Sequence, residues 1–195
     1  MDMNFESKYL VRWGMPGWVY MIFVTAFYAI NHPDQFFQKL NSEDFPLVGF
    51  VAFAAAFGII LGHLIHQVSL FFGFVLLQYT KKNKRWRRYF RKEFKIDKRI
   101  IEEGEIGAKI KDIYSYRLGQ LHARRGLLAS LILSFITIIV MVLYIDTSYI
   151  NDKTLILSAI NGLLIMIMLI NYHYFDRNLD YFMTRINDFE NKVKQ

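Results

Sequence analysis

Four long stretches without a charged side chain constrain the fold of this chain. Residues 13–33, 45–80, 126–145 and 154–175 contain no Asp, Glu, Lys or Arg. A helix rises ~1.5 Å per residue and the hydrocarbon of a bilayer is ~30 Å thick, so about 20 apolar residues cross it. Each stretch is long enough, and 54% of the residues are hydrophobic, a high share for a soluble domain. The sequence therefore predicts an all-α polytopic membrane protein.

We place four transmembrane helices within a single membrane domain, 1–195. The second stretch could instead hold a hairpin with a turn near Gly62, which would give five spans. No Pro, Asn or Asp lies near Gly62 to make that turn, and unpaired backbone is costly in lipid. We therefore expect one helix that crosses the bilayer and runs on along or below its inner surface. The predicted spans are about 14–32, 46–68, 126–145 and 154–175.

The distribution of basic residues predicts the orientation. Residues 80–126 carry 16 Lys or Arg and six Asp or Glu. The connections 31–45 and 146–153 carry only Lys39 and Lys153. Basic loops stay on the cytoplasmic side of a membrane. We therefore expect the central loop, the N-terminus and the C-terminus in the cytoplasm.

The segment 84–95 reads KRWRRYFRKEFK, and seven of its twelve residues are Lys or Arg. Trp86, Phe90 and Phe94 recur every four residues, and we expect Tyr89 on the same side. Such a helix lies at a membrane interface, with aromatic rings at the headgroup boundary and cations on anionic lipid. Single-stranded nucleic acid or a protein partner would use the same residues, but a position just after a span favours lipid, and we expect no nucleic acid. The predicted lipid-surface residues are Lys84, Arg85, Trp86, Arg87, Arg88, Phe90, Arg91, Lys92 and Phe94.

The central loop, 80–125, is predicted to be a cytoplasmic helical hairpin. Apolar residues follow helical spacing on both sides of Gly104 and Gly107, which are candidate breaks. We expect helices at 82–103 and 108–125, and the second could run straight into the third span.

The C-terminal segment, 176–195, is predicted to be a cytoplasmic amphipathic helix. Its apolar residues alternate by three and four, as in the a/d pattern of a left-handed helix pair. The segment could pack on the hairpin of the same chain or form a coiled coil between subunits. The seam residues are Leu179, Phe182, Ile186, Phe189 and Val193.

Small residues recur every four positions within the spans. Lipid tails are as apolar as leucine, so close approach between small residues favours helix contacts in a bilayer. These stripes predict contacts within a subunit or between subunits. The stripes are Ala54, Gly58 and Gly62 in the second span, Gly126, Ser130 and Ser134 in the third, and Ser158 and Gly162 in the fourth.

Polar side chains at membrane depth are candidates for function. His63 and His66 share a helix face, but a metal site needs further ligands and the chain has no cysteine. We expect no metal and no cofactor. His66 continues the stripe of Gly62 at i+4, so a hydrogen-bonded packing role is the simpler interpretation. The candidate pore or sensing residues are His63, His66, Asn161, Asn171 and His173.

Two classes of function follow. No Walker loop, GxSxG, HExxH or dinucleotide fingerprint is present, so we do not expect an enzyme. A homo-oligomeric membrane sensor or effector would signal through its cytoplasmic helices to a soluble partner. A small channel or transporter would instead line a pore with polar faces of spans two to four.

The layout resembles that of small four-span bacterial proteins in antiphage operons, such as KwaA, the membrane component of Kiwa systems. Three features carry the resemblance: four spans, the basic inner loop RWRRYFRKEFK and the inner C-terminal tail. It covers the whole chain as architecture and transfers no functional residue. It implies an oligomer in the bacterial inner membrane that pairs with a cytosolic effector on infection.

Overall fold

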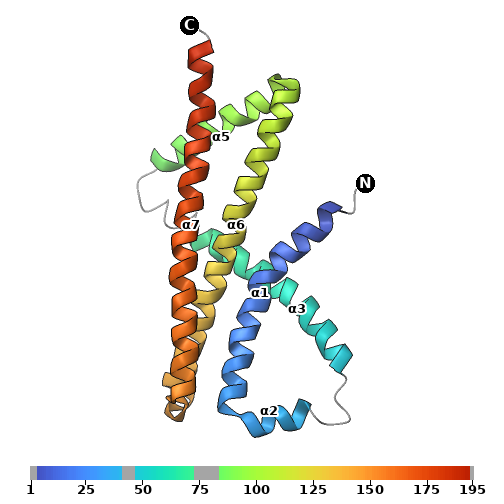
Figure 1. Ribbon diagram of the computed structural model, residues 1–195, viewed down its shortest axis with the longest axis vertical. Helices are drawn as coiled ribbons and strands as arrows, with labels where there is room; N and C mark the ends of the chain where they lie inside the picture. The colour runs from blue at the N-terminus through green and yellow to red at the C-terminus, as the bar shows by residue number, and fades with distance from the viewer. Residues whose placement is uncertain (1–3, 41–46, 73–83, 194–195) are drawn as a thin grey trace. The chain divides into compact units, whose positions relative to one another are not determined.

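The computed structural model describes residues 4–40, 47–72 and 84–193 (Figure 1). These residues form helices and short connections, and none of them lies in a strand. The prediction of an all-α fold is confirmed. The elements are α1 (Asn4–Asn31), α2 (Pro33–Leu40), α3 (Leu47–Leu70), α5 (Lys84–Glu102), α6 (Gly104–Val140), η2 (Met141–Ile145), η3 (Thr147–Tyr149) and α7 (Asp152–Val193).

Four of these helices are long and apolar enough to cross a membrane, as in a multi-pass membrane protein. α3 passes through Gly62 without a break, so the hairpin considered for the second span has no turn there. The surface extension expected after this span falls mostly on 73–83, outside the described residues. The candidate spans are Trp13–Asn31, Val48–Leu70, Gly104–Ile145 and Asp152–Ile186.

α2 is a short helix in the connection between the first two spans, and the sequence did not predict it. It begins at Pro33, whose missing N–H is tolerated in a first helical turn, and Asp34 follows where a negative charge suits the helix dipole. Lys39 lies in the last turn, where a cation is favourable.

The break between α5 and α6 lies at Gly104. Its φ of 53° is in the left-handed region, which glycine adopts without the penalty of a Cβ. Gly107 lies inside α6 and is not a second break. A Cβ on Gly107 would lie 3.0 Å from the carbonyl oxygen of Arg99, so glycine there lets α6 approach the end of α5. α6 then continues to Val140, as the sequence suggested.

The chain divides into two compact units. The first, here called the apolar unit, comprises Met1–Ser69 and Gly126–Leu169. The second, called the basic unit, comprises Leu70–Arg125 and Ile170–Gln195. α6 and α7 are continuous helices that each contribute residues to both units.

In the apolar unit, α1 and α3 touch backbone to backbone. A Cβ on Gly17 would overlap the carbonyl oxygen of Gly58 and lie 2.6 Å from the amide nitrogen of Gly62. Trp18 Nε1 donates to the carbonyl oxygen of Ala55 over 3.1 Å. The Gly58 and Gly62 positions of the second-span stripe therefore make a helix contact within the chain.

α1 also contacts α6 through polar groups. Pro16 is buried inside α1, and its carbonyl oxygen accepts a hydrogen bond from Ser130 Oγ. Tyr20 and Thr137 share a second hydrogen bond of 3.1 Å between their hydroxyl groups. The serine stripe of the third span thus lies against the proline of the first.

The basic unit has an apolar core of its own. α5 lies against α6 and α7 in Figure 1, and side chains from all three helices form one cluster. The C-terminal part of α7 therefore packs on the hairpin of the same chain, one of the two arrangements that the sequence allowed. The buried members are Ile96, Ile110, Tyr114, Leu121, Leu179 and Met183.

Candidate functional site

The outward face of α5 combines cations with exposed aromatic rings. Phe94 is 70% exposed and Phe90 is 49% exposed. Basic side chains one turn apart flank them, so an anionic surface would meet charge and apolar area together. Six residues line a shallow hollow of about 580 Å³: Arg87, Phe90, Arg91, Phe94, Lys95 and Lys98.

Other residues of the same segment point elsewhere. Lys92 turns toward α7, where its Nζ lies 2.6 Å from Asp180 Oδ1 and 2.9 Å from Thr184 Oγ1. Tyr89 packs against the core of the basic unit, so it does not share the face of Phe90 and Phe94 as expected. The side chains of Lys84, Arg85, Trp86 and Arg88 lie outside the described residues.

Polar contacts on the inner face of α5 accompany the apolar core. Tyr114 of α6 donates to Glu93 over 2.8 Å. Arg99 pairs with Glu103 at 2.6 Å and donates to the carbonyl oxygen of Ile186 on α7. Burial raises the pKa of Tyr89 above its usual value of 10.0, and the nearby Glu93 carboxylate raises it further. Its neutral form is therefore stabilised in the folded unit.

Two arginines of α6 stack on aromatic rings of α7. The guanidinium carbon of Arg124 lies 3.5 Å from the ring centroid of Phe175. Arg117 lies 4.6 Å from the centroid of Phe182 and donates to the side chain of Asn178. Among the predicted seam residues, Leu179 is buried, Phe182 and Ile186 pack against the core, and the side chains of Phe189 and Val193 lie outside the described residues.

The burial of Arg125 was not predicted. The sequence indicated a cytoplasmic charge at this position, yet the residue is only 7% exposed. Its Nε and Nη2 atoms are buried and have no hydrogen-bond partner within 4–40, 47–72 and 84–193. An arginine directly before an uncharged stretch was the available signal, but periodicity does not tell which way it points.

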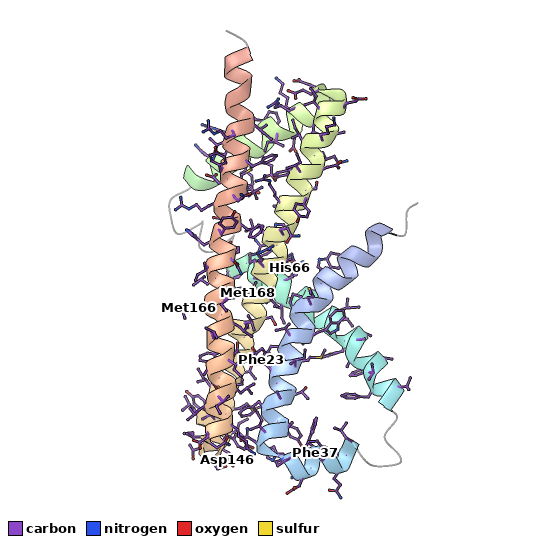
Figure 2. The ribbon with its side chains drawn as sticks, viewed as in Figure 1. Phe23, Phe37, His66, Asp146, Met166 and Met168 are labelled. Carbon is purple, nitrogen blue, oxygen red and sulfur yellow. The ribbon has the colours of Figure 1, made fainter. Side chains whose placement is uncertain are left out.

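The histidines lie at separate places. His63 is exposed and meets Trp13 edge-on, with 5.3 Å between ring centroids. His66 is partly buried, and a Cβ on Gly126 would lie 3.6 Å from its Nδ1 (Figure 2). His173 and Asn171 are exposed on α7. No three potential metal ligands gather within the described ranges.

Asn161 is the buried polar group of the fourth span. Its Nδ2 donates to Ser134 Oγ over 2.9 Å, and Ser134 in turn donates to the carbonyl oxygen of Leu131 over 2.9 Å. Asn161 Oδ1 is buried, and no described residue donates a hydrogen bond to it. The structure therefore brings Asn161 to the serine stripe of the third span.

A polar network ties the end of α1 to the start of α7, and the sequence did not predict it. Asn31 donates to Thr154 Oγ1 over 3.2 Å, and Asn151 donates to Asn31 Oδ1 over 2.8 Å. His32 Nε2 and the hydroxyl of Tyr149 share a hydrogen bond of 3.1 Å. These contacts fix the short connection whose Asp146 is labelled in Figure 2.

The chain was compared with family models, curated proteins and solved structures. No family model, curated protein or solved structure matches the chain.

Proposed function

We propose that this protein is a non-enzymatic, homo-oligomeric sensor or effector of the bacterial inner membrane. It couples an event in its spans to a cytosolic partner, in the setting of antiphage defence. The basic unit faces the cytoplasm in this proposal, with both termini on the same side.

The continuity of α6 and α7 is the observation that carries the proposal. Each helix supplies apolar residues to a candidate span and core residues to the basic unit without an intervening loop. A packed helix moves as a rigid element, since interiors are close-packed and resist continuous deformation. A displacement in the bilayer is therefore passed to the basic unit.

The outward face of α5 supplies a surface for the output. It offers cations beside exposed Phe90 and Phe94, while its inner face is held by the core and by Lys92. In the resting state this surface binds anionic lipid. When the basic unit moves, the surface becomes available to an acidic face on the partner.

Purification in mild detergent followed by native mass spectrometry tests the proposal. The expected result is a multimer of this chain with a soluble protein bound. A triple variant, Arg87→Gln, Arg91→Gln and Lys95→Gln, should release that protein without changing the multimer. The control, Lys109→Gln and Lys111→Gln, removes two exposed charges of α6. A monomer without a partner would contradict the proposal.

A channel or transporter is the second candidate, and one observation favours it. In the buried Ser134–Asn161 pair, Asn161 Oδ1 has no partner among the described residues, and an unsatisfied oxygen at membrane depth is a ligand for water or a cation. Ion flux in proteoliposomes tests this function. Flux that disappears in Asn161→Leu and in His66→Ala would support it, whereas tight proteoliposomes would exclude it.

A further inference from the structure

Arg125 presents a charge that no other part of the described chain neutralises. It is buried in the basic unit, directly before the uncharged residues 126–145. Among the described residues it forms no ion pair with a carboxylate. A buried charge without a partner is strongly unfavourable, so proteins pair such groups or use them.

Two tyrosines act electrostatically on Arg125, but neutral phenols do not balance its charge. They are Tyr172 of α7 and Tyr89 of α5. Asp176 acts electrostatically on both tyrosines but does not pair with Arg125. Arg124, the preceding residue of α6, adds a second positive charge, and neighbouring cations attract anions.

The two atoms without partners define a specific binding edge. Nε–H and one Nη2–H lie in the guanidinium plane along the same edge and point in one direction. This pair matches two oxygens of a phosphate or carboxylate and binds them side-on. An ammonium group does not offer such a fork, so lysine is a poor replacement.

We propose that Arg125 binds a phosphate group through its Nε–Nη2 edge. The phosphate belongs to the headgroup of an anionic phospholipid or to a free phosphate compound. Both nitrogens are shielded in the structure, so the side chains that cover them turn aside to admit the group. This site requires the membrane position of the chain but not its function as a sensor.

Native mass spectrometry of the purified chain tests the site. The probes are phosphatidylglycerol, a phosphate-free glycolipid of the same chain length, and inorganic phosphate. We expect the wild-type chain to retain phosphatidylglycerol over the glycolipid, and Arg125→Lys to retain about tenfold less. Arg177→Lys, which changes an exposed arginine of α7, should behave as wild type. Equal retention by wild type and Arg125→Lys would overturn the proposal.

Inorganic phosphate separates the two sources. If it displaces phosphatidylglycerol and raises the melting temperature of wild type but not of Arg125→Lys, the ligand is a free phosphate compound. If it does neither while the lipid preference holds, the ligand is a headgroup.

A second variant guards against misfolding. Arg125→Met replaces a buried charge by an apolar side chain and should keep its helical circular dichroism. If this folded variant binds phosphatidylglycerol as wild type does, the proposal is overturned. The wild-type chain also tests the proposal without any variant. A phosphate site would be excluded if the wild type retained the phospholipid and the glycolipid equally and did not respond to inorganic phosphate.

Discussion

The guanidinium of Arg124 lies over the ring of Phe175, 3.5 Å from its centroid, and Arg117 repeats the contact with Phe182 at 4.6 Å. The two arginines are seven residues apart on α6, and the two rings are seven residues apart on α7. Seven residues make about two helical turns. The antiparallel helices therefore form the same kind of Arg–Phe contact at two levels, two turns apart. Charges that indicate topology in the sequence thus also hold the basic unit together.

A double-mutant cycle on Arg124 and Phe175 measures one of these contacts. We expect Arg124→Gln and Phe175→Leu to be coupled by about 0.5–2 kcal/mol, since the ring face attracts the cation. Unfolding in detergent, followed by circular dichroism, gives the free energies. Additive effects would mean that the stacking contributes nothing to stability.

The crossing of α1 and α3 should not tolerate a side chain at Gly17. Gly17→Ala places a Cβ against the backbone of Gly58, which cannot rotate away, and we expect a loss of about 1–3 kcal/mol. Gly162→Ala is the control, because nothing lies within 4 Å of its added Cβ. Thermal unfolding should separate the two variants, and equal melting temperatures would refute the close crossing.

Packing should hold α5 more strongly than its ion pair does. Ile96 is fully buried, so Ile96→Ala should cost about 2–5 kcal/mol. Lys92→Ala should cost only about 0.2–1 kcal/mol, because the Asp180 side chain is 61% exposed and water screens the pair. Hydrogen exchange of the α5 amides gives both values. A larger effect from Lys92→Ala would reverse this ranking.

The basic unit should lose stability at alkaline pH. Burial raises the pKa of Tyr89 above 10.0, so the folded unit keeps a proton that the unfolded chain releases near pH 10. This stabilisation is complete below about pH 10 and is lost as the pH rises through the raised value. Melting curves from pH 9 to 11.5 should fall less steeply for Tyr89→Phe. Tyr116→Phe, at an exposed position, is the control, and identical slopes for all three chains would contradict the assignment.

An environment-sensitive dye can test the outward face of α5. The chain has no cysteine, so Phe94→Cys provides a single attachment point. We expect a blue shift of the dye in phosphatidylglycerol bilayers and a smaller one in phosphatidylcholine, since the flanking cations favour anionic lipid. A dye attached through Tyr116→Cys in α6 is the reference. No difference between the two lipids would argue against lipid binding by this face.

Helix existence and length could be predicted because they follow from local properties. Uncharged stretches set the candidate spans, and glycine at 104 predicted the break before α6. The sequence allowed α6 to continue through 122–126, where it has no proline, and the structure shows that it does. These features depend on the local sequence and on the surrounding solvent or lipid, not on tertiary contacts.

The choice of neighbours could not be predicted, because it depends on tertiary packing. α5 carries apolar residues on two faces, and the pattern alone does not tell that Tyr89 and Ile96 face protein while Phe94 faces outward. The inward turn of Lys92 and the unpaired edge of Arg125 depend on where α7 passes. A helical wheel shows which residues share a side, but not what that side meets.

The heptad register of α6 against α7 has a mechanical consequence. Seven residues rise about 10 Å along a helix, so the two contacts lie at two separate levels of the same helix pair. A slide of α7 by a single turn would separate both guanidinium groups from their rings at once. The two contacts thus fix the axial register of the helices in the basic unit.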